Sequence, residues 1–279
     1  MEFREYGHEK AETIILLHGG GLSWWNYRNV AEQLQQDFRV ILPVLDGHAG
    51  SDREFTSIED NAAEIISFVD HQLGGSVLLF GGLSLGAQIV LEILSQKNDI
   101  CRYAIVESAS VIPSRLTNTL IAPAFGCSYG LIKNRGFAKL QFRSLHMRPD
   151  LFEEYYRDTC RITKSGMIAF LKANTAYAPK RVLQNCQAEI RIVVGGKEQK
   201  TMIRSANLLH EMLQKSVLEI KEGLHHGEYS INHPELYAAE LMQAAAAAKC
   251  PENKLFQAVS GPGVHTGDVS KTTIRQTIR

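Results

Sequence analysis

The sequence lacks the features by which membrane-spanning and secreted proteins are usually identified. No stretch of its 279 residues approaches the roughly 18 consecutive apolar residues that a membrane-spanning helix needs. Its first five residues, MEFRE, do not show the basic and then apolar pattern of a secretory signal. The five cysteines are an odd number without CxxC spacing, which argues against a disulfide framework or a structural zinc site. We therefore expect a cytoplasmic protein with reduced thiols.

The sequence also has no net charge, so the overall charge gives no argument for binding nucleic acid or an anionic membrane. The charge is nevertheless unevenly spread. Residues 111–183 hold 12 Lys and Arg against 4 Asp and Glu, a balance of +8, so the rest of the chain carries −8. This basic segment would suit an anionic substrate, or its cations could form solvated helix faces that dock on the acidic remainder. We expect a small-molecule partner, and neither nucleic acid nor a membrane.

Short apolar runs alternate with amphipathic helical stretches over most of the chain. The runs are typical of buried strands, and they lie at residues 13–17, 38–45, 77–80, 103–106, 190–194 and 217–221. Helical periodicity is clearest at residues 58–73, 84–96, 201–213 and about 234–248. Alternating helices and buried strands predict an α/β fold with a mostly parallel central sheet and helices on both faces.

The alternation is interrupted between residues 111 and about 184, where only helix-like segments occur, punctuated by proline and glycine. We expect this insertion to form a helical cap over one edge of the sheet, after the fourth clear strand. After Cys250 the composition changes to Pro, Gly, Ser, Thr and Lys without apolar periodicity. We therefore expect one domain over residues 1–248 and a mostly disordered tail over residues 249–279.

The pentapeptide GLSLG, Gly82–Gly86, directly follows the apolar run at 77–80 and directly precedes a helical stretch. A serine in a strand-to-helix turn, with glycine two residues away on either side, is the pattern of a nucleophile elbow. Such a turn is sharp, and glycine avoids the collisions that side chains at the flanking positions would make with neighbouring backbone. The pattern predicts that Ser84 is a nucleophile at the end of the sheet.

A serine nucleophile needs a base, and the base needs an acid that orients it. The loop after the last predicted strand emerges on the same side of the sheet as the elbow. It offers His226 as the candidate base and His225 as the alternative. Glu198 is the first carboxylate in the turn after the preceding strand, and it is the candidate acid. Glu107, at the end of the strand at 103–106, is the alternative acid.

Acyl transfer develops an oxyanion, which needs positioned N–H donors. One candidate donor is the backbone N–H of Leu85, which follows the nucleophile at a helix N-terminus where such donors are free. The turn His18–Gly21 (HGGG) follows the first buried strand and could supply the other, from Gly20 first and Gly21 next. Its backbone can approach a ligand closely because no Cβ intervenes. We expect His18 to orient this turn. Neither GxGxxG nor GxxxxGK[ST] is present, so the turn is unconvincing as a phosphate loop.

These motifs together resemble those of the α/β-hydrolase fold family. The resemblance rests on the HGGG turn, the GLSLG elbow, the acid position at 198, and the segments at 46–51 and 224–237. Nucleophile, acid and histidine also follow one another in the chain order of that family. The sequence departs from the family in placing Glu rather than the commoner Asp at the acid position, and in its short region before the first strong strand.

The resemblance implies a serine hydrolase of the carboxylesterase or thioesterase kind, which forms an acyl-enzyme on Ser84 and needs no metal or organic cofactor. The serine points away from relatives that use an aspartate nucleophile, such as haloalkane dehalogenases and epoxide hydrolases. The alternative is a hydrolase-like ligand receptor or regulator with little turnover. Six aromatic residues of the cap are candidates for the pocket wall or for the core: Phe125, Tyr129, Phe142, Tyr155, Phe170 and Tyr177.

Overall fold

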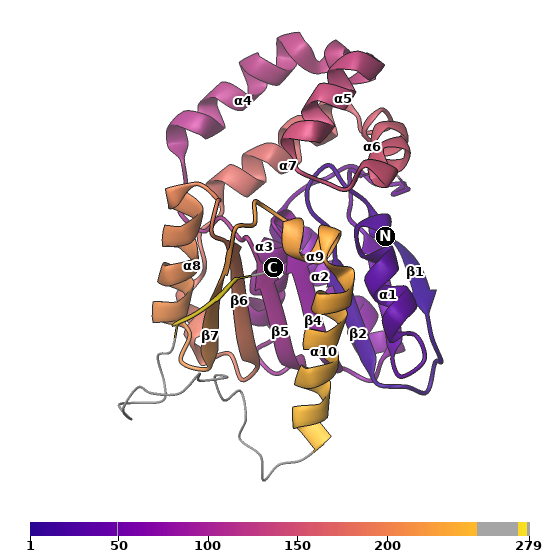
Figure 1. The fold of residues 1–279 in the computed structure, drawn as a ribbon, viewed down its shortest axis with the longest axis vertical. Coiled ribbons are helices and arrows are strands. Elements are labelled where there is room, and N and C mark those ends of the chain that lie inside the picture. The colour runs from indigo at the N-terminus through magenta and orange to yellow at the C-terminus, as the bar shows by residue number, and fades with distance from the viewer. Residues whose placement is uncertain (49, 250–272, 278–279) are drawn as a thin grey trace.

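The computed structural model describes residues 1–48, 50–249 and 273–277 (Figure 1). The strands form one sheet of eight described strands in the order β1-β3-β2-β4-β5-β6-β7-β8, in which β1 pairs with β3 antiparallel and every other pair is parallel. Their bounds are β1 (Glu2–Tyr6), β2 (Thr13–Leu17), β3 (Arg39–Val44), β4 (Val77–Leu83), β5 (Cys101–Glu107), β6 (Glu189–Gly195), β7 (Ser216–Glu222) and β8 (Thr273–Thr277).

Side chains alternate between the two faces of this sheet, and each face packs against its own helices. On one face Ile15, Phe80 and Val106 join the cluster that contains α2 (Ile58–Gln72), α3 (Leu85–Gln96) and α8 (Lys200–Met212). On the other face Ile14 and Leu79 pack with α1 (Arg28–Leu34), α9 (Glu228–Asn232) and α10 (Pro234–Lys249). The strands are buried on both faces because helices cover both sides. The predicted α/β class with a mostly parallel sheet is confirmed.

The chain between β5 and β6 contains helices only, and we call residues 111–184 the cap segment. These helices lie beyond one end of the strands (Figure 1). They are α4 (Arg115–Ser128), α5 (Arg135–Ser144), α6 (Phe152–Thr159) and α7 (Lys164–Ala176). The 3₁₀ turn η2 (Tyr129–Lys133) joins α4 to α5, η3 (Pro149–Leu151) precedes α6, and η4 (Arg181–Asn185) follows α7. The buried amide of Gln88 on α3 holds α7, since its Nε2 donates to Asn174 O and its Oε1 accepts from Asn174 Nδ2, both at 3.0 Å.

The two ends of the chain differ from the expectation. The first residues form β1, whose polar, half-exposed sequence carries little strand signal. Most of the expected disordered tail, residues 250–272 and 278–279, lies outside the described residues. Thr273–Thr277 correct that expectation, because they form β8 and pair with β7. Within the part of the chain that the structure describes, no helix has the length and hydropathy needed to cross a membrane.

The elbow between β4 and α3 holds Ser84 in a strained backbone conformation, with φ 53° and ψ −110°. Non-glycine residues in sparsely populated regions of this kind cost about 1–3 kcal/mol and persist only where surrounding structure imposes them. The surroundings here are backbone. A Cβ on Gly82 would lie 2.5 Å from Gly86 O, and a Cβ on Gly86 would lie 2.1 Å from Leu17 O at the end of β2. Both flanking positions therefore require glycine.

Two buried histidines hold the glycine-rich turn after β2. His18 Nδ1 donates to Gly19 O at 2.9 Å, and its Nε2 accepts from Leu45 N–H at 3.1 Å. His48 Nε2 accepts from Gly21 N–H at 3.0 Å, and its Nδ1 contacts Asp46 O at 3.0 Å. These bonds require neutral rings with the proton on Nδ1. Burial accordingly lowers the pKa of His18 to about 3 and that of His48 to about 4.

Substitution of Gly86 by alanine should destabilise the fold severely, because the new Cβ would meet a backbone carbonyl that cannot move independently of β2. We expect Gly86→Ala to lower the free energy of unfolding by at least about 3 kcal/mol, or to prevent folding. Gly130→Ala is the matched control, since a Cβ there meets no atom within 4 Å. It should change stability by no more than about 1 kcal/mol. Urea unfolding of both variants tests this, and equal midpoints would contradict it.

The contribution of His18 and His48 to stability should fall as the pH drops from 6.5 toward 4. In the unfolded chain a histidine has a pKa near 6.5, whereas the pKa values of folded His18 and His48 are lower. Below pH 6.5 the unfolded state therefore binds protons at these two residues that the folded state does not bind. Each histidine adds at most about 1.4 kcal/mol per pH unit to this slope. Urea unfolding at a series of pH values measures it.

His48→Gln keeps an acceptor for Gly21 N–H but cannot titrate, so it should flatten the slope. His71→Gln, which replaces an exposed histidine on α2, is the matched control. A slope that is unchanged in His48→Gln would contradict a neutral, buried His48.

Candidate active site

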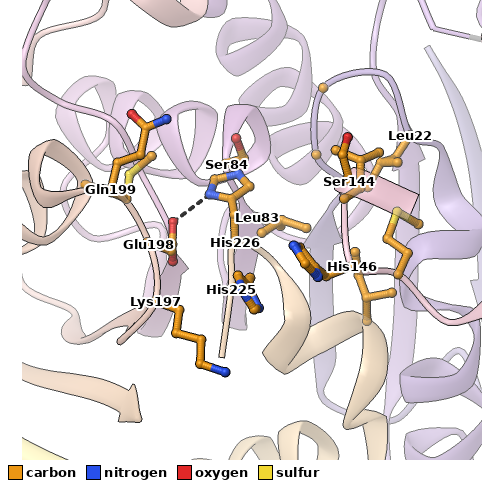
Figure 2. Close-up of a pocket in the computed structure, with 16 residues that line it drawn as sticks. Leu22, Leu83, Ser84, Ser144, His146, Lys197, Glu198, Gln199, His225 and His226 are labelled. Carbon is orange, nitrogen blue, oxygen red and sulfur yellow. Dashed lines mark hydrogen bonds and ion pairs between the residues drawn. The ribbon is translucent and has the colours of Figure 1, made fainter. Parts of the chain in front are cut away.

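Three side chains from three neighbouring loops meet at the carboxyl ends of the parallel strands. Ser84 follows β4, Glu198 lies in the turn after β6, and His226 lies in the loop after β7. His226 Nδ1 donates to Glu198 Oε2 at 2.7 Å. Figure 2 shows the His226 ring between this carboxylate and the Ser84 side chain. The structure therefore brings together the three residues that the sequence singled out as nucleophile, base and acid.

The Glu198 carboxylate is held by two further donors on its other oxygen. Oε1 accepts from Ser108 Oγ at 2.7 Å and from Gly195 N–H at 2.7 Å, which leaves Oε2 for His226. Ser108 directly follows β5 and has a positive φ of 54°. The sequence did not predict this role, because Ser108 belongs to no recognised motif. Its one signal was its position, at the carboxyl end of a predicted strand.

The two alternative residues are close to the site but have other hydrogen-bond partners. Glu107 is buried, and its Oε1 accepts from Ser230 N–H at 3.3 Å. Burial raises the pKa of this carboxyl to about 7. His225 Nδ1 contacts Glu228 Oε2 at 2.8 Å, and its ring stacks on His146 of the cap segment. Contact with Glu198 thus distinguishes His226 from His225, and contact with His226 distinguishes Glu198 from Glu107.

The pair has the electrostatics of a stabilised imidazolium. Burial by itself would raise the pKa of Glu198, but hydrogen bonds from His226, Ser108 and Gly195 outweigh it, so the pKa lies below its usual value. For His226 the direction is reversed: desolvation by itself would lower its pKa. The hydrogen bond to Glu198 and the negative charge of that carboxylate outweigh this effect, and the pKa of His226 is raised above 6.5. The His226 ring remains 43% exposed, which leaves it open to a substrate.

The expected oxyanion donors differ in availability. Leu85 is the first residue of α3, where backbone N–H groups have no partner within the helix. Gly20 lies beside it, since a Cβ on Gly20 would be 3.6 Å from Leu85 Cβ. Gly21 was a wrong prediction, because its N–H already donates to His48 Nε2. That bond turns Gly21 away from the site and fixes the backbone next to Gly20.

A cavity of about 380 Å³ opens beside Ser84, and Gly20, Glu198 and His226 also line it. Most of its wall is apolar, formed by Leu22, Leu83, Leu145, Met147, Met202 and Ile231. The cap segment contributes Ser144–Met147 to this wall. The six aromatic residues of the cap segment do not line this cavity. Phe142, Tyr155, Phe170 and Tyr177 are buried in the two core clusters, and Phe125 and Tyr129 pack against the cluster that contains α2, α3 and α8.

One group among the described residues has the donor types of a metal site. The possible ligand atoms of His146, His225 and Glu228 all lie within 4.8 Å of one another. The two rings, however, are stacked at 3.7 Å with 7° between their planes. A cation in the plane of one ring would therefore lie out of the plane of the other. The Glu228 carboxylate has a partner in the His225 ring, and that ring stacks on His146. These contacts join the cap segment to the loop that carries His226.

Comparisons with known proteins agree with this architecture. The esterase from Thermogutta terrifontis has a TM-score of 0.71 and 17% identity, over 87% of this chain and 91% of that one. The esterase EaEST from Exiguobacterium antarcticum has a TM-score of 0.74 and 19% identity, over 88% and 94% of the two chains. The enol-lactonase from Burkholderia xenovorans LB400 has a TM-score of 0.74 and 14% identity, over 88% and 96%. At these identities the likeness shows the fold.

Sequence comparisons extend this result. The soluble epoxide hydrolase of Corynebacterium sp. (strain C12) is 31% identical over an 80-residue match, which covers 24% of this chain. The match spans only 28% of that enzyme's length. A family model described as the alpha/beta hydrolase family matches residues 14–240, a range that includes Ser84, Glu198 and His226. The chain therefore belongs to the alpha/beta hydrolase family.

Proposed function

We propose that the protein is a serine hydrolase that cleaves an ester or thioester of a small molecule through an acyl-enzyme on Ser84. The observation that carries this proposal is the 2.7 Å hydrogen bond between His226 and Glu198, on the wall of the cavity that also holds Ser84. A receptor that only binds a ligand has no need for a strained serine beside an oriented base.

The residues divide the reaction between them. His226 Nε2 takes the proton from Ser84 Oγ as that oxygen attacks the substrate carbonyl, and Glu198 stabilises the resulting imidazolium. The N–H groups of Leu85 and Gly20 donate to the oxyanion of the tetrahedral intermediate. His226 then gives its proton to the leaving alcohol or thiol. Water, activated by the same imidazole, releases the acid and regenerates Ser84.

The serine also favours a carbonyl substrate over an epoxide, despite the short match to an epoxide hydrolase. Attack by Ser84 on a carbonyl gives an ester, which water can hydrolyse. Attack on an epoxide carbon would give an ether, which has no carbonyl for water to attack and would trap the enzyme. The esterases and the lactonase that share the fold act, by name, on carbonyl compounds. The cavity, near the lower end of the range for ligand pockets, suits a short acyl chain.

Hydrolysis of p-nitrophenyl esters with acyl chains of two to twelve carbons should be fastest for the short chains, and Ser84→Ala should lower kcat by at least about 10³-fold. His226→Ala should have a similar effect. Ser144→Ala removes a hydroxyl from the same cavity and should leave kcat within about threefold, because Ser144 is not placed to react. Turnover that survives in Ser84→Ala would contradict the proposal. Tight ligand binding without turnover in the parent protein would favour the receptor instead.

The pH dependence of kcat/KM should show an acid limb with an apparent pKa above 6.5, because His226 must be neutral to act as a base and Glu198 raises its pKa. Glu198→Gln should move this limb to lower pH and lower kcat by about 10²–10⁴-fold. Glu228→Gln is the matched control, since that carboxylate contacts His225 rather than His226. It should leave the limb in place. A limb unmoved by Glu198→Gln would exclude Glu198 as the partner of the base.

A further inference from the structure

The cap segment exposes an unusual share of large apolar side chains. Nine such side chains are exposed in the described residues, and five of them lie between residues 116 and 140: Leu116, Leu120, Leu131, Phe137 and Leu140. Leu116 is 75% exposed and Leu140 67%. Single exposed leucines are common on protein surfaces, but several on adjoining elements mark an interaction site. We call α4, η2 and α5 with these side chains the apical surface.

The elements of the apical surface adjoin one another. Both α4 and α5 pack against η2. Leu116 and Leu120 are one turn apart on α4 and so share a helix face, opposite the contacts that Asn118 makes with Lys172 O and Thr175 Oγ1 of α7. In Figure 1, α4 and α5 are the helices farthest from the sheet. The apolar side chains are therefore carried on the outermost part of the molecule.

The charged residues in the part of the cap segment that carries the apical surface are all basic. Residues 115–143 contain five Lys and Arg and no Asp or Glu. All five cations are exposed: Arg115, Lys133, Arg135, Lys139 and Arg143. Arg135 forms an ion pair with Glu153 of α6, which lies outside this range. Although the whole chain has no net charge, this surface combines exposed leucines with a net positive charge.

We propose that the apical surface docks on a membrane that contains anionic phospholipid, a partner that the overall charge of the sequence gave no reason to expect. Leucine and phenylalanine side chains enter the interface between headgroups and acyl chains, while lysine and arginine remain at the level of the phosphates. A second copy of the chain is a poorer occupant for this surface, because two surfaces of the same sign repel each other when they face. An anionic bilayer offers both an apolar interior and the opposite charge.

The placement of the apical surface relates it to the cavity. The four cap residues of the cavity wall, Ser144–Met147, begin at the last residue of α5. The chain therefore runs from a helix of the apical surface directly into this wall. Membrane docking does not depend on the proposed esterase chemistry, and its test uses binding alone.

Co-sedimentation with lipid vesicles tests the proposal. The full chain should bind vesicles of phosphatidylcholine mixed with phosphatidylglycerol, bind vesicles of phosphatidylcholine alone at least about tenfold less, and dissociate as salt screens the charges. The triple variant Leu116→Ser/Leu120→Ser/Leu140→Ser should bind the mixed vesicles at least about tenfold less than the parent. Lys133→Gln/Lys139→Gln/Arg143→Gln should show a similar loss and a weaker salt dependence.

Matched controls lie on the helices that flank the sheet. Leu208→Ser on α8 and Leu236→Ser on α10 also remove exposed leucines and should bind like the parent. Circular dichroism establishes that each variant is folded. Failure of the parent to bind mixed vesicles, or binding that the apical variants leave unchanged, would overturn the proposal. Concentration-dependent oligomers that disappear in the triple leucine variant would overturn it in favour of an interface between copies.

Discussion

The close approach of the Ser84 turn to the end of β2 is the constraint on which the site depends. Backbone of the first turn of α3 lies so near Leu17 O that only glycine fits at position 86. This contact forces the chain to reverse within one residue and leaves Ser84 with a positive φ. It also brings the start of α3 beside the glycine-rich turn that follows β2, so that Leu85 and Gly20 become neighbours. One packing contact between two backbone segments therefore places the serine and both candidate oxyanion donors together.

Hydrogen bonds fix the polar groups of the site in defined orientations. Each oxygen of Glu198 has its own partners, with Ser108 and Gly195 on Oε1 and His226 on Oε2. His48 binds Gly21 N–H, which leaves the neighbouring N–H of Gly20 for a ligand. Such networks orient side chains because any other arrangement would leave a buried polar atom without a partner. The site is thus arranged before a ligand binds, as the proposed stabilisation of a transition state would require.

Local patterns carried most of what the sequence could predict. Apolar runs indicated the buried parallel strands, and a glycine-flanked serine after such a run indicated the elbow. Both features depend on residues that are close in sequence. Features set by distant packing were missed. The polar residues of β1 gain their strand conformation from pairing with β3. Ser108 matters only because β6 brings Glu198 next to it, and the engaged N–H of Gly21 depends on where His48 folds back. The cavity wall at Ser144–Met147 depends on how the cap helices cross, which periodicity does not encode.

The stacking of His146 on His225 links two properties that are usually considered separately. His146 belongs to the cavity wall supplied by the cap segment, and His225 directly precedes the candidate base. Asn232 strengthens the link, because its amide donates to His146 O and accepts from Arg148 N–H. A ligand that displaces this wall therefore changes the free energy of the loop that orients His226. Since such coupling is reciprocal, the protonation and alignment of the imidazole must in turn influence ligand affinity. Ligand affinity at this wall and the protonation of His226 are therefore linked equilibria.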